Sequence, residues 1–182
     1  MEGIPKMELK FRDLKSSEID VRIATLNEKG ATLLLYKDAR VDQDILDETV
    51  GAMNWQRKHS RDNANCTVEI WDTDKNMWVS KEDTGTESNT EKEKGLASDS
   101  FKRACFNWGI GRELYTSPFI WVSAENMQIY DSGRKDSFGK PIYATKDKYR
   151  VEAIEITDKV ITGLAIKNNR NERVFTYRKG AK

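Results

Sequence analysis

Histidine and cysteine are scarce in this 182-residue chain, which has one His and two Cys. Zinc sites draw most of their ligands from these residue types, and His59, Cys66 and Cys105 show no zinc-binding spacing. Cys66 falls on an expected strand and Cys105 on the apolar side of an expected helix, so we expect two buried thiols rather than a disulfide. The sequence predicts neither a metal site nor a disulfide framework.

Long apolar runs are also absent, and 34% of the residues are charged. No segment approaches the roughly 20 apolar residues of a membrane helix. Residues 1–6 lack the apolar region of a signal peptide. We therefore expect no membrane contact and a cytoplasmic location.

An excess of either charge is missing, because 31 Lys and Arg stand against 30 Asp and Glu. General attraction to nucleic acid is therefore absent, and any binding must come from a local basic patch. No phosphate-binding loop of the Walker type occurs, which argues against ATP use. His59 has no nucleophile and acid arranged around it, and the carboxylates Asp42, Asp44 and Glu48 lack supporting histidines for a metal-dependent nuclease. We expect no enzyme and no cofactor.

One long helix is marked at both ends. Thr90 with Glu93 three residues later forms a capping box, and Gly109 closes the far end. Between them an apolar stripe recurs at helical spacing, while Lys102 and Arg103 fall largely off it. We expect the apolar stripe of this helix to pack on a sheet and the charged residues beside the stripe to face solvent.

Several strands and one shorter helix precede it. Alternating residues predict a hairpin over residues 19–36, and apolar spacing predicts a helix over 38–53. Alternation then predicts a three-stranded antiparallel meander over residues 54–82. The fold class is therefore α+β.

The sequence pattern changes after Pro118. Residues 119–123 are a short apolar exit, and residues 131–141, with Gly133, Gly139 and mixed charges, predict a loop. Alternation predicts a hairpin from residues 149–156 and 160–166, joined by a third strand at 173–177. We expect a core of residues 1–118 and a C-terminal β extension of residues 119–182, packed on the core or on an oligomer edge.

Five segments, in order and at compatible spacing, resemble a known family. They are Ile19-Asp20-Val21-Arg22, Arg40-Val41, Val50-Gly51-Ala52-Met53-Asn54-Trp55, Glu82-Asp83-Thr84-Gly85 and Asp99-Ser100-Phe101-Lys102-Arg103-Ala104 with Gly109. The chain resembles the Rad-fifty-two/twenty-two-type single-strand annealing proteins over residues 19–118. The run of residues 86–118 is most similar to the phage and bacterial branch.

The resemblance implies a set of DNA-binding residues. It aligns Arg22, Lys102 and Arg103 with a groove that runs around an oligomeric ring and grips the backbone of one DNA strand. The family has a further arginine where this chain has Phe106, so two alternatives stay open: a weaker hold on phosphates, or stacking of Phe106 on a base. Further candidates are Arg40 and, for an outer DNA site, Lys92 and Lys94.

The expected function follows from the resemblance. It implies ATP-independent binding of single-stranded DNA and annealing of complementary strands in recombination or break repair, by a ring or helical homo-oligomer in a bacterial or phage-infected cell. A single-strand-binding protein is a possible partner by analogy. The alternative is an oligomeric nucleic-acid-binding or recombination accessory protein on the same fold that does not anneal.

Each candidate residue also has a purely structural interpretation. Asp99 and Arg103 have the spacing of an i,i+4 ion pair, and Arg22 fits an ordinary outward-facing strand residue. Trp71 and Trp78 fall on one side of the expected hairpin. If no helix covers that side, they are candidates for an oligomer interface.

Overall fold

The computed structural model describes residues 9–86 and 92–181. Its described residues form two compact units, one within Met1–Asp13 and Ala39–Gly111 (unit 1) and one within Leu14–Asp38 and Arg112–Lys182 (unit 2). The protein has the expected α+β class, with antiparallel strands and two α-helices among the described residues. The division differs from the expected boundary at residue 118, because the N-terminal hairpin joins a sheet with the C-terminal strands.

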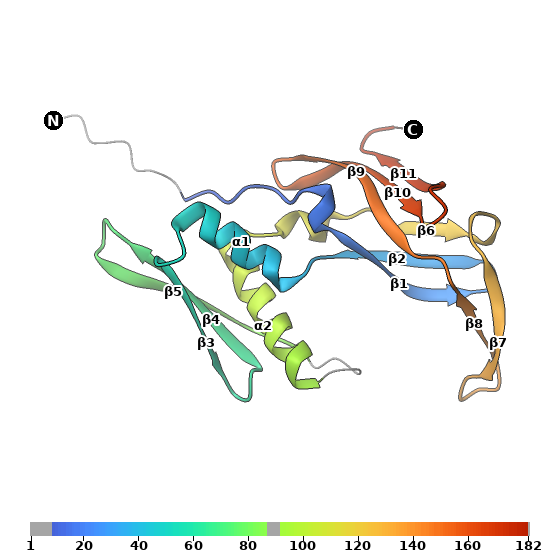
Figure 1. Cartoon of the computed structure of the whole chain (residues 1–182), viewed down its shortest axis with the longest axis horizontal. Coiled ribbons are helices and arrows are strands. Elements are labelled where there is room, and N and C mark those ends of the chain that lie inside the picture. The colour runs from blue at the N-terminus through green and yellow to red at the C-terminus, as the bar shows by residue number, and fades with distance from the viewer. Residues whose placement is uncertain (1–8, 87–91, 182) are drawn as a thin grey trace. The chain divides into compact units, whose positions relative to one another are not determined.

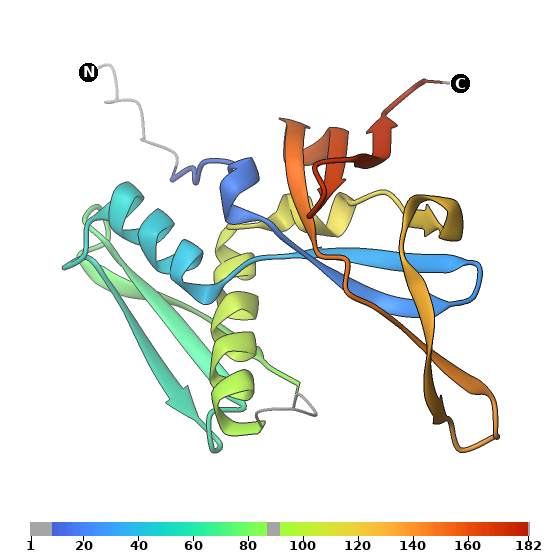
Figure 2. The ribbon, with the colours of Figure 1, turned by 45° about the vertical axis from the view of Figure 1, so that its right-hand side comes forward.

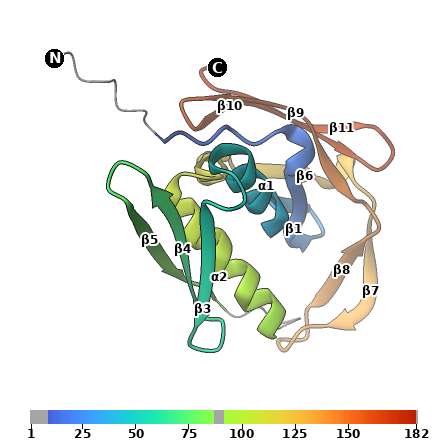
Figure 3. The ribbon, with the colours of Figure 1, turned by 60° about the vertical axis from the view of Figure 1, so that its left-hand side comes forward.

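Unit 1 places a long helix on a three-stranded antiparallel sheet (Figure 3). The expected order of a helix, three strands and a long helix is confirmed. The elements are α1 (Ala39–Val50), β3 (Trp55–Ser60), β4 (Asn65–Asp72), β5 (Met77–Thr84) and α2 (Lys92–Trp108).

The core of unit 1 follows from alternation in β4. Cys66, Val68 and Ile70 are buried and point to the face on which α2 packs, where Phe101 and Ala104 are fully buried. Both cysteines are buried and free, as predicted. Burial raises the pKa of the Cys66 thiol to about 11, which keeps it protonated and unreactive at neutral pH.

Gly109 ends α2 as the sequence predicts. Its φ of +106° lies in a region that a residue with a Cβ avoids. The amide of Ile110 donates to the carbonyl of Cys105 at 3.2 Å, and the Gly109 amide donates to Phe106 at 2.9 Å. These two bonds are those of a Schellman motif, which satisfies carbonyls that a helix end leaves open. The predicted capping residue Thr90 lies outside the described residues.

Unit 2 is built on a six-stranded sheet in the order β11-β10-β9-β1-β2-β6 (Figure 1). The predicted hairpins and the third C-terminal strand are confirmed, and the apolar exit after Pro118 is also a strand. The bounds are β1 (Asp20–Asn27), β2 (Gly30–Tyr36), β6 (Ile120–Ser123), β9 (Tyr149–Thr157), β10 (Val160–Asn168) and β11 (Arg173–Arg178). The short 3-10 helices are η1 (Ser16–Glu18), η2 (Arg112–Thr116) and η3 (Ala124–Asn126).

A separate antiparallel hairpin, β7 (Ile129–Lys135) with β8 (Pro141–Thr145), stands out from this sheet (Figure 2). The prediction of a loop over residues 131–141 is therefore right for residues 136–140 only, and wrong for the strand residues on either side. Alternation is broken at Ser132 and Gly133, where the pairing register shifts between Asp131 and Arg134. The bulge hides the strand periodicity, while Gly139 and Pro141 suggest a loop.

We predict that Gly85→Ala destabilises unit 1. A Cβ at Gly85 would lie 2.7 Å from the Ser100 amide nitrogen and 3.0 Å from the Leu96 carbonyl oxygen, both in the backbone of α2. We expect a loss of about 1–3 kcal/mol in the free energy of unfolding, as for other overpacked sites. Urea unfolding followed by tryptophan fluorescence measures it, because four of the five tryptophans lie in unit 1.

Thr73→Ala, in the turn between β4 and β5, is the control, since the Thr73 side chain is exposed. We expect a change within about 0.5 kcal/mol. Equal stability of Gly85→Ala and wild type would contradict the close approach of residue 85 to α2.

Candidate nucleic-acid interface

The basic residues of α2 differ in their bonding. The Arg103 Nε donates to the Asp99 Oδ2 at 2.9 Å, so the predicted i,i+4 ion pair is confirmed. Lys102 makes no hydrogen bond or ion pair with any described residue. Phe106 lies one turn further along and is half-buried. Lys102 is therefore the cation of this pair that remains available to a ligand.

Asp99 holds this part of the helix to the end of β5. Its Oδ2 accepts from the Thr86 amide at 2.9 Å as well as from Arg103. Burial favours the protonated acid, but these hydrogen bonds and the nearby cations together lower the pKa of Asp99 below its usual range. Asp99 therefore stays ionised at neutral pH and orients Arg103.

Three further side-chain bonds fix α2 on its sheet. The Ser100 Oγ donates to the Asn63 carbonyl at 2.9 Å, and the Asn107 Nδ2 donates to the Asp83 Oδ2 at 3.1 Å. The Trp108 Nε1 donates to the Val68 carbonyl at 3.1 Å. These bonds hold α2 before residue 102 and after residue 103. The backbone that carries Lys102 and Arg103 is therefore fixed on the sheet.

Two cations of the sheet lie against aromatic rings of α2, a pairing that sequence reasoning missed. The Arg57 guanidinium is 4.6 Å from the centroid of the Phe101 ring, and the Lys81 Nζ is 4.5 Å from that of Trp108. Lys81 also donates to the Asn107 carbonyl at 2.8 Å. Strand alternation puts Arg57 and Lys81 on the face of the sheet that α2 covers. Their contacts with the rings follow from how the helix packs on the sheet, which the sequence does not give.

Arg22 lies in unit 2, on the solvent face of β1, as the structural interpretation predicts. It is exposed and has no hydrogen bond or ion pair with any described residue. Its register partner is Leu34, and alternation puts Tyr36 on the same face. Trp121 of β6 shares that face, and Tyr36 and Trp121 are 40% and 36% exposed. Arg22 is thus an available cation beside exposed apolar and aromatic groups.

The remaining predicted DNA-binding residues are less defined. Arg40 is exposed in the first turn of α1 and has interactions within the protein. The side chains of Lys92 and Lys94 lie outside the described residues.

Trp71 and Trp78 pack edge to face, with ring centroids 5.4 Å apart. They pair across β4 and β5 on the face opposite α2, and both are half-buried. Whether a second subunit covers them stays a prediction.

The acid–base and metal alternatives gain no support from the described residues. The His59 Nδ1 is 3.5 Å from the Ser100 Oγ, but Ser100 is fully buried and donates to a carbonyl. Asp42 is buried, and the Glu48 carboxylate is bonded to Arg12. No group of three potential metal ligands occurs in the part of the chain that the structure describes.

Charge is divided unevenly between the units. Unit 2 contains 18 Lys and Arg against 13 Asp and Glu, whereas unit 1 contains 13 against 17. The net charge near zero therefore conceals a basic unit and an acidic one. The net charge of unit 2 would attract a polyanion and that of unit 1 would repel it.

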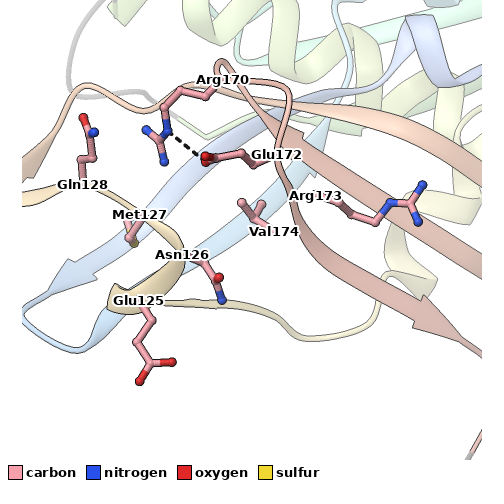
Figure 4. A pocket seen from close by; sticks show the side chains of 8 residues that line it. All are labelled: Glu125, Asn126, Met127, Gln128, Arg170, Glu172, Arg173 and Val174. Carbon is pink, nitrogen blue, oxygen red and sulfur yellow. Dashed lines mark hydrogen bonds and ion pairs between the residues drawn. The ribbon is translucent and has the colours of Figure 1, made fainter.

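A pocket of about 360 Å³ lies between η3 and the start of β11 (Figure 4). Arg170 is bonded there to Asp147 and Glu172, and Arg173 to Glu152 at 2.7 Å. Arg173 helps lower the pKa of Glu152 to about 2. The positive charges of the pocket are already neutralised, so it is a poor site for an anion.

Comparison with protein-family models, curated proteins and solved structures gives no match for this chain. Neither helix in the described part of the chain has the length and hydrophobicity needed to cross a bilayer.

We predict that Asp99→Asn destabilises the protein at neutral pH only. The folded pKa of Asp99 is lowered, so its ionised form contributes stability above the unfolded pKa of about 3.9. That contribution is lost as the pH falls through the folded pKa. At about pH 7 we expect a loss of about 0.5–1 kcal/mol. Urea midpoints at a series of pH values should converge with those of wild type in acid.

Asp62→Asn makes the same charge change at an exposed turn of unit 1. We expect it to change the free energy of unfolding at about pH 7 by less than about 0.5 kcal/mol. A constant difference between Asp99→Asn and wild type at every pH would contradict a role for the Asp99 charge.

Proposed function

We propose that this protein binds single-stranded DNA as an oligomer and anneals complementary strands without ATP, in homologous recombination or break repair. The observation that carries the proposal is that Arg22 and Lys102, two positions at which the family contacts DNA, are cations without an ion pair among the described residues. Several other cations do have an acidic partner, as Arg12, Lys58 and Arg178 do. A cation that forms no internal pair can neutralise a phosphate without first losing a protein contact.

The order of elements gives independent support. A hairpin, a helix, three antiparallel strands and a long helix follow one another over residues 20–108. This is the order that the resemblance to the Rad-fifty-two-type core implies. The same order accounts for a glycine at position 85. Gly85 directly follows the third strand, where the chain passes too close to the long helix for a side chain.

The proposed mechanism depends on contacts to the backbone of the DNA. Annealing requires that repulsion between the phosphates of two strands be reduced while the base edges stay free to pair. One or two available cations per subunit bind a strand weakly, but many subunits on one strand act together through effective concentration. An oligomer would therefore repeat the α2 cations along the DNA.

Arg103 and Phe106 limit the strength of each contact. Arg103 reaches a phosphate while its Nε is held by Asp99, and Phe106 stands where the family has another arginine. A second candidate function gains support from this pairing: an oligomeric accessory protein on the same fold that binds DNA without annealing it.

We predict that Lys102→Ala and Arg22→Ala each slow annealing and weaken DNA binding. Each should lower the affinity for a labelled single strand by about tenfold, the effect of losing one charged contact. Each should also reduce the slope of log affinity against log salt by about 0.7. Asp99→Asn should have the opposite effect and tighten binding, because it removes a negative charge beside two cations.

The controls are Lys75→Ala in unit 1 and Arg178→Ala in unit 2, which remove exposed cations with acidic partners. Annealing of two complementary oligonucleotides without nucleotide cofactor is followed by fluorescence. Loss in the test variants but not in the controls supports annealing. Binding without acceleration in wild type would favour the accessory function, and no binding at any salt concentration would reject both.

We predict that Trp71 and Trp78 contribute to subunit contacts. The double variant Trp71→Ser, Trp78→Ser should shift the oligomer toward smaller species in light scattering, since aromatic side chains dominate interface energies. Met77→Ser alters an exposed side chain of the same hairpin and serves as the control. A wild-type monomer, or a double variant of unchanged mass, would exclude this interface.

A further inference from the structure

The β7–β8 hairpin presents an aromatic ring to solvent at its tip. Phe138 is 86% exposed, whereas a phenyl ring normally contributes to folding by burial. A single exposed apolar residue needs no explanation by itself. Three features of the hairpin distinguish this one: an ordered tip, exposed cations close to it in sequence and a braced base.

The tip is ordered by Asp136. Its Oδ1 accepts from the amides of Phe138 at 2.8 Å and Lys140 at 2.9 Å. The Asp136 amide donates to the Lys140 carbonyl at 2.9 Å, and Gly139 closes the turn with a φ of +77°. The backbone beneath the ring is therefore fixed before any ligand binds.

Three cations lie within four residues of Phe138 in the sequence. Arg134, Lys135 and Lys140 are exposed, and their side chains make no hydrogen bond or ion pair within the described chain. Both acids of the hairpin accept hydrogen bonds from its backbone amides. Asp136 accepts at the tip, and the Asp131 Oδ1 accepts from the Gly133 amide at 2.8 Å. The end of the hairpin thus carries three exposed cations, none ion-paired with a described residue, close in sequence to one exposed ring.

The base of the hairpin is braced on unit 2. Buried Asp147 accepts from the Gln128 amide at 2.8 Å and forms an ion pair with Arg170. The Tyr143 hydroxyl donates to Glu28, in the turn between β1 and β2, at 3.2 Å. A braced base and an ordered tip lower the entropy that ligand binding would cost.

We propose that the β7–β8 hairpin is a second contact for single-stranded DNA, in which Phe138 stacks on a base while Arg134, Lys135 and Lys140 contact flanking phosphates. An exposed ring on a hairpin end with exposed cations on both of its faces complements a ligand that alternates flat bases with negative charges. A single strand fits better than a duplex, because its bases are open to stacking without unpairing. The inference takes its ligand from the proposed function and adds a contact outside residues 19–118.

The test measures binding of the full-length protein to two labelled strands of equal length, an oligothymidylate and an abasic strand. Phe138→Ala should weaken binding to oligothymidylate by about tenfold, since stacking on one base contributes about 1–3 kcal/mol. It should leave binding to the abasic strand unchanged. The triple variant Arg134→Ala, Lys135→Ala, Lys140→Ala should weaken binding to both strands and reduce the salt slope by up to about 2.

Three further variants make the result specific. Met53→Ala removes another highly exposed apolar side chain, in unit 1, and should have no effect. Phe138→Trp should retain the preference for strands with bases. Asp136→Ala should lower that preference without altering the salt slope, because it disorders the tip but keeps the cations.

The inference fails if Phe138→Ala behaves like Met53→Ala on both strands. It also fails if Phe138 is needed only for binding to vesicles of anionic phospholipid, which would indicate a membrane contact. If Arg22→Ala and Lys102→Ala weaken binding but the hairpin variants do not, the hairpin inference alone is wrong. If wild type binds neither strand, the proposed function fails with it.

Discussion

The attachment of α2 to its sheet is the constraint on which the candidate site of unit 1 depends. The backbone passes so close to the helix at Gly85 that no side chain fits there. Two helix residues then form hydrogen bonds with the loops of the sheet. Asp99 accepts from the Thr86 amide, after β5, and Ser100 donates to the Asn63 carbonyl, between β3 and β4. These contacts fix the helix, so that Lys102 and Arg103, which lie one turn beyond Asp99, are presented in a fixed direction.

The same constraint determines which cations are available. Asp99 is needed to hold the helix, so it remains ionised and takes part of the charge of Arg103. Arg57 and Lys81 lie on the rings of Phe101 and Trp108. Lys102 lies near Asp99 but forms no hydrogen bond or ion pair with any residue that the structure describes. Availability of charge, more than its amount, therefore marks the candidate interface of a chain that is nearly neutral overall.

The two units differ in net charge, and therefore in how they would contribute to the proposed DNA binding. Unit 2 has the positive net charge, the exposed Arg22 and the basic β7–β8 hairpin, whereas unit 1 is acidic apart from local patches. Acidic side chains in unit 2 repeatedly serve its own structure, as Asp136, Asp147 and Glu152 do. Asp147 and Glu152 neutralise Arg170 and Arg173, so the exposed cations of unit 2 that have no such pair among the described residues, Arg22 among them, are the candidates to bind an external anion.

The sequence by itself determined the elements whose signals are local. Alternation identified β1 to β5 and β9 to β11, helical spacing and Gly109 identified α2, and the spacing of Asp99 and Arg103 predicted their ion pair. The tertiary structure alone decided the partnership of strands far apart in sequence, such as β1 beside β9, and so the division into units. It alone showed the hairpin at residues 129–145, because a bulge interrupts the periodicity there. It also decided which cations have partners, since an ion pair depends on distances between side chains that chain order does not specify.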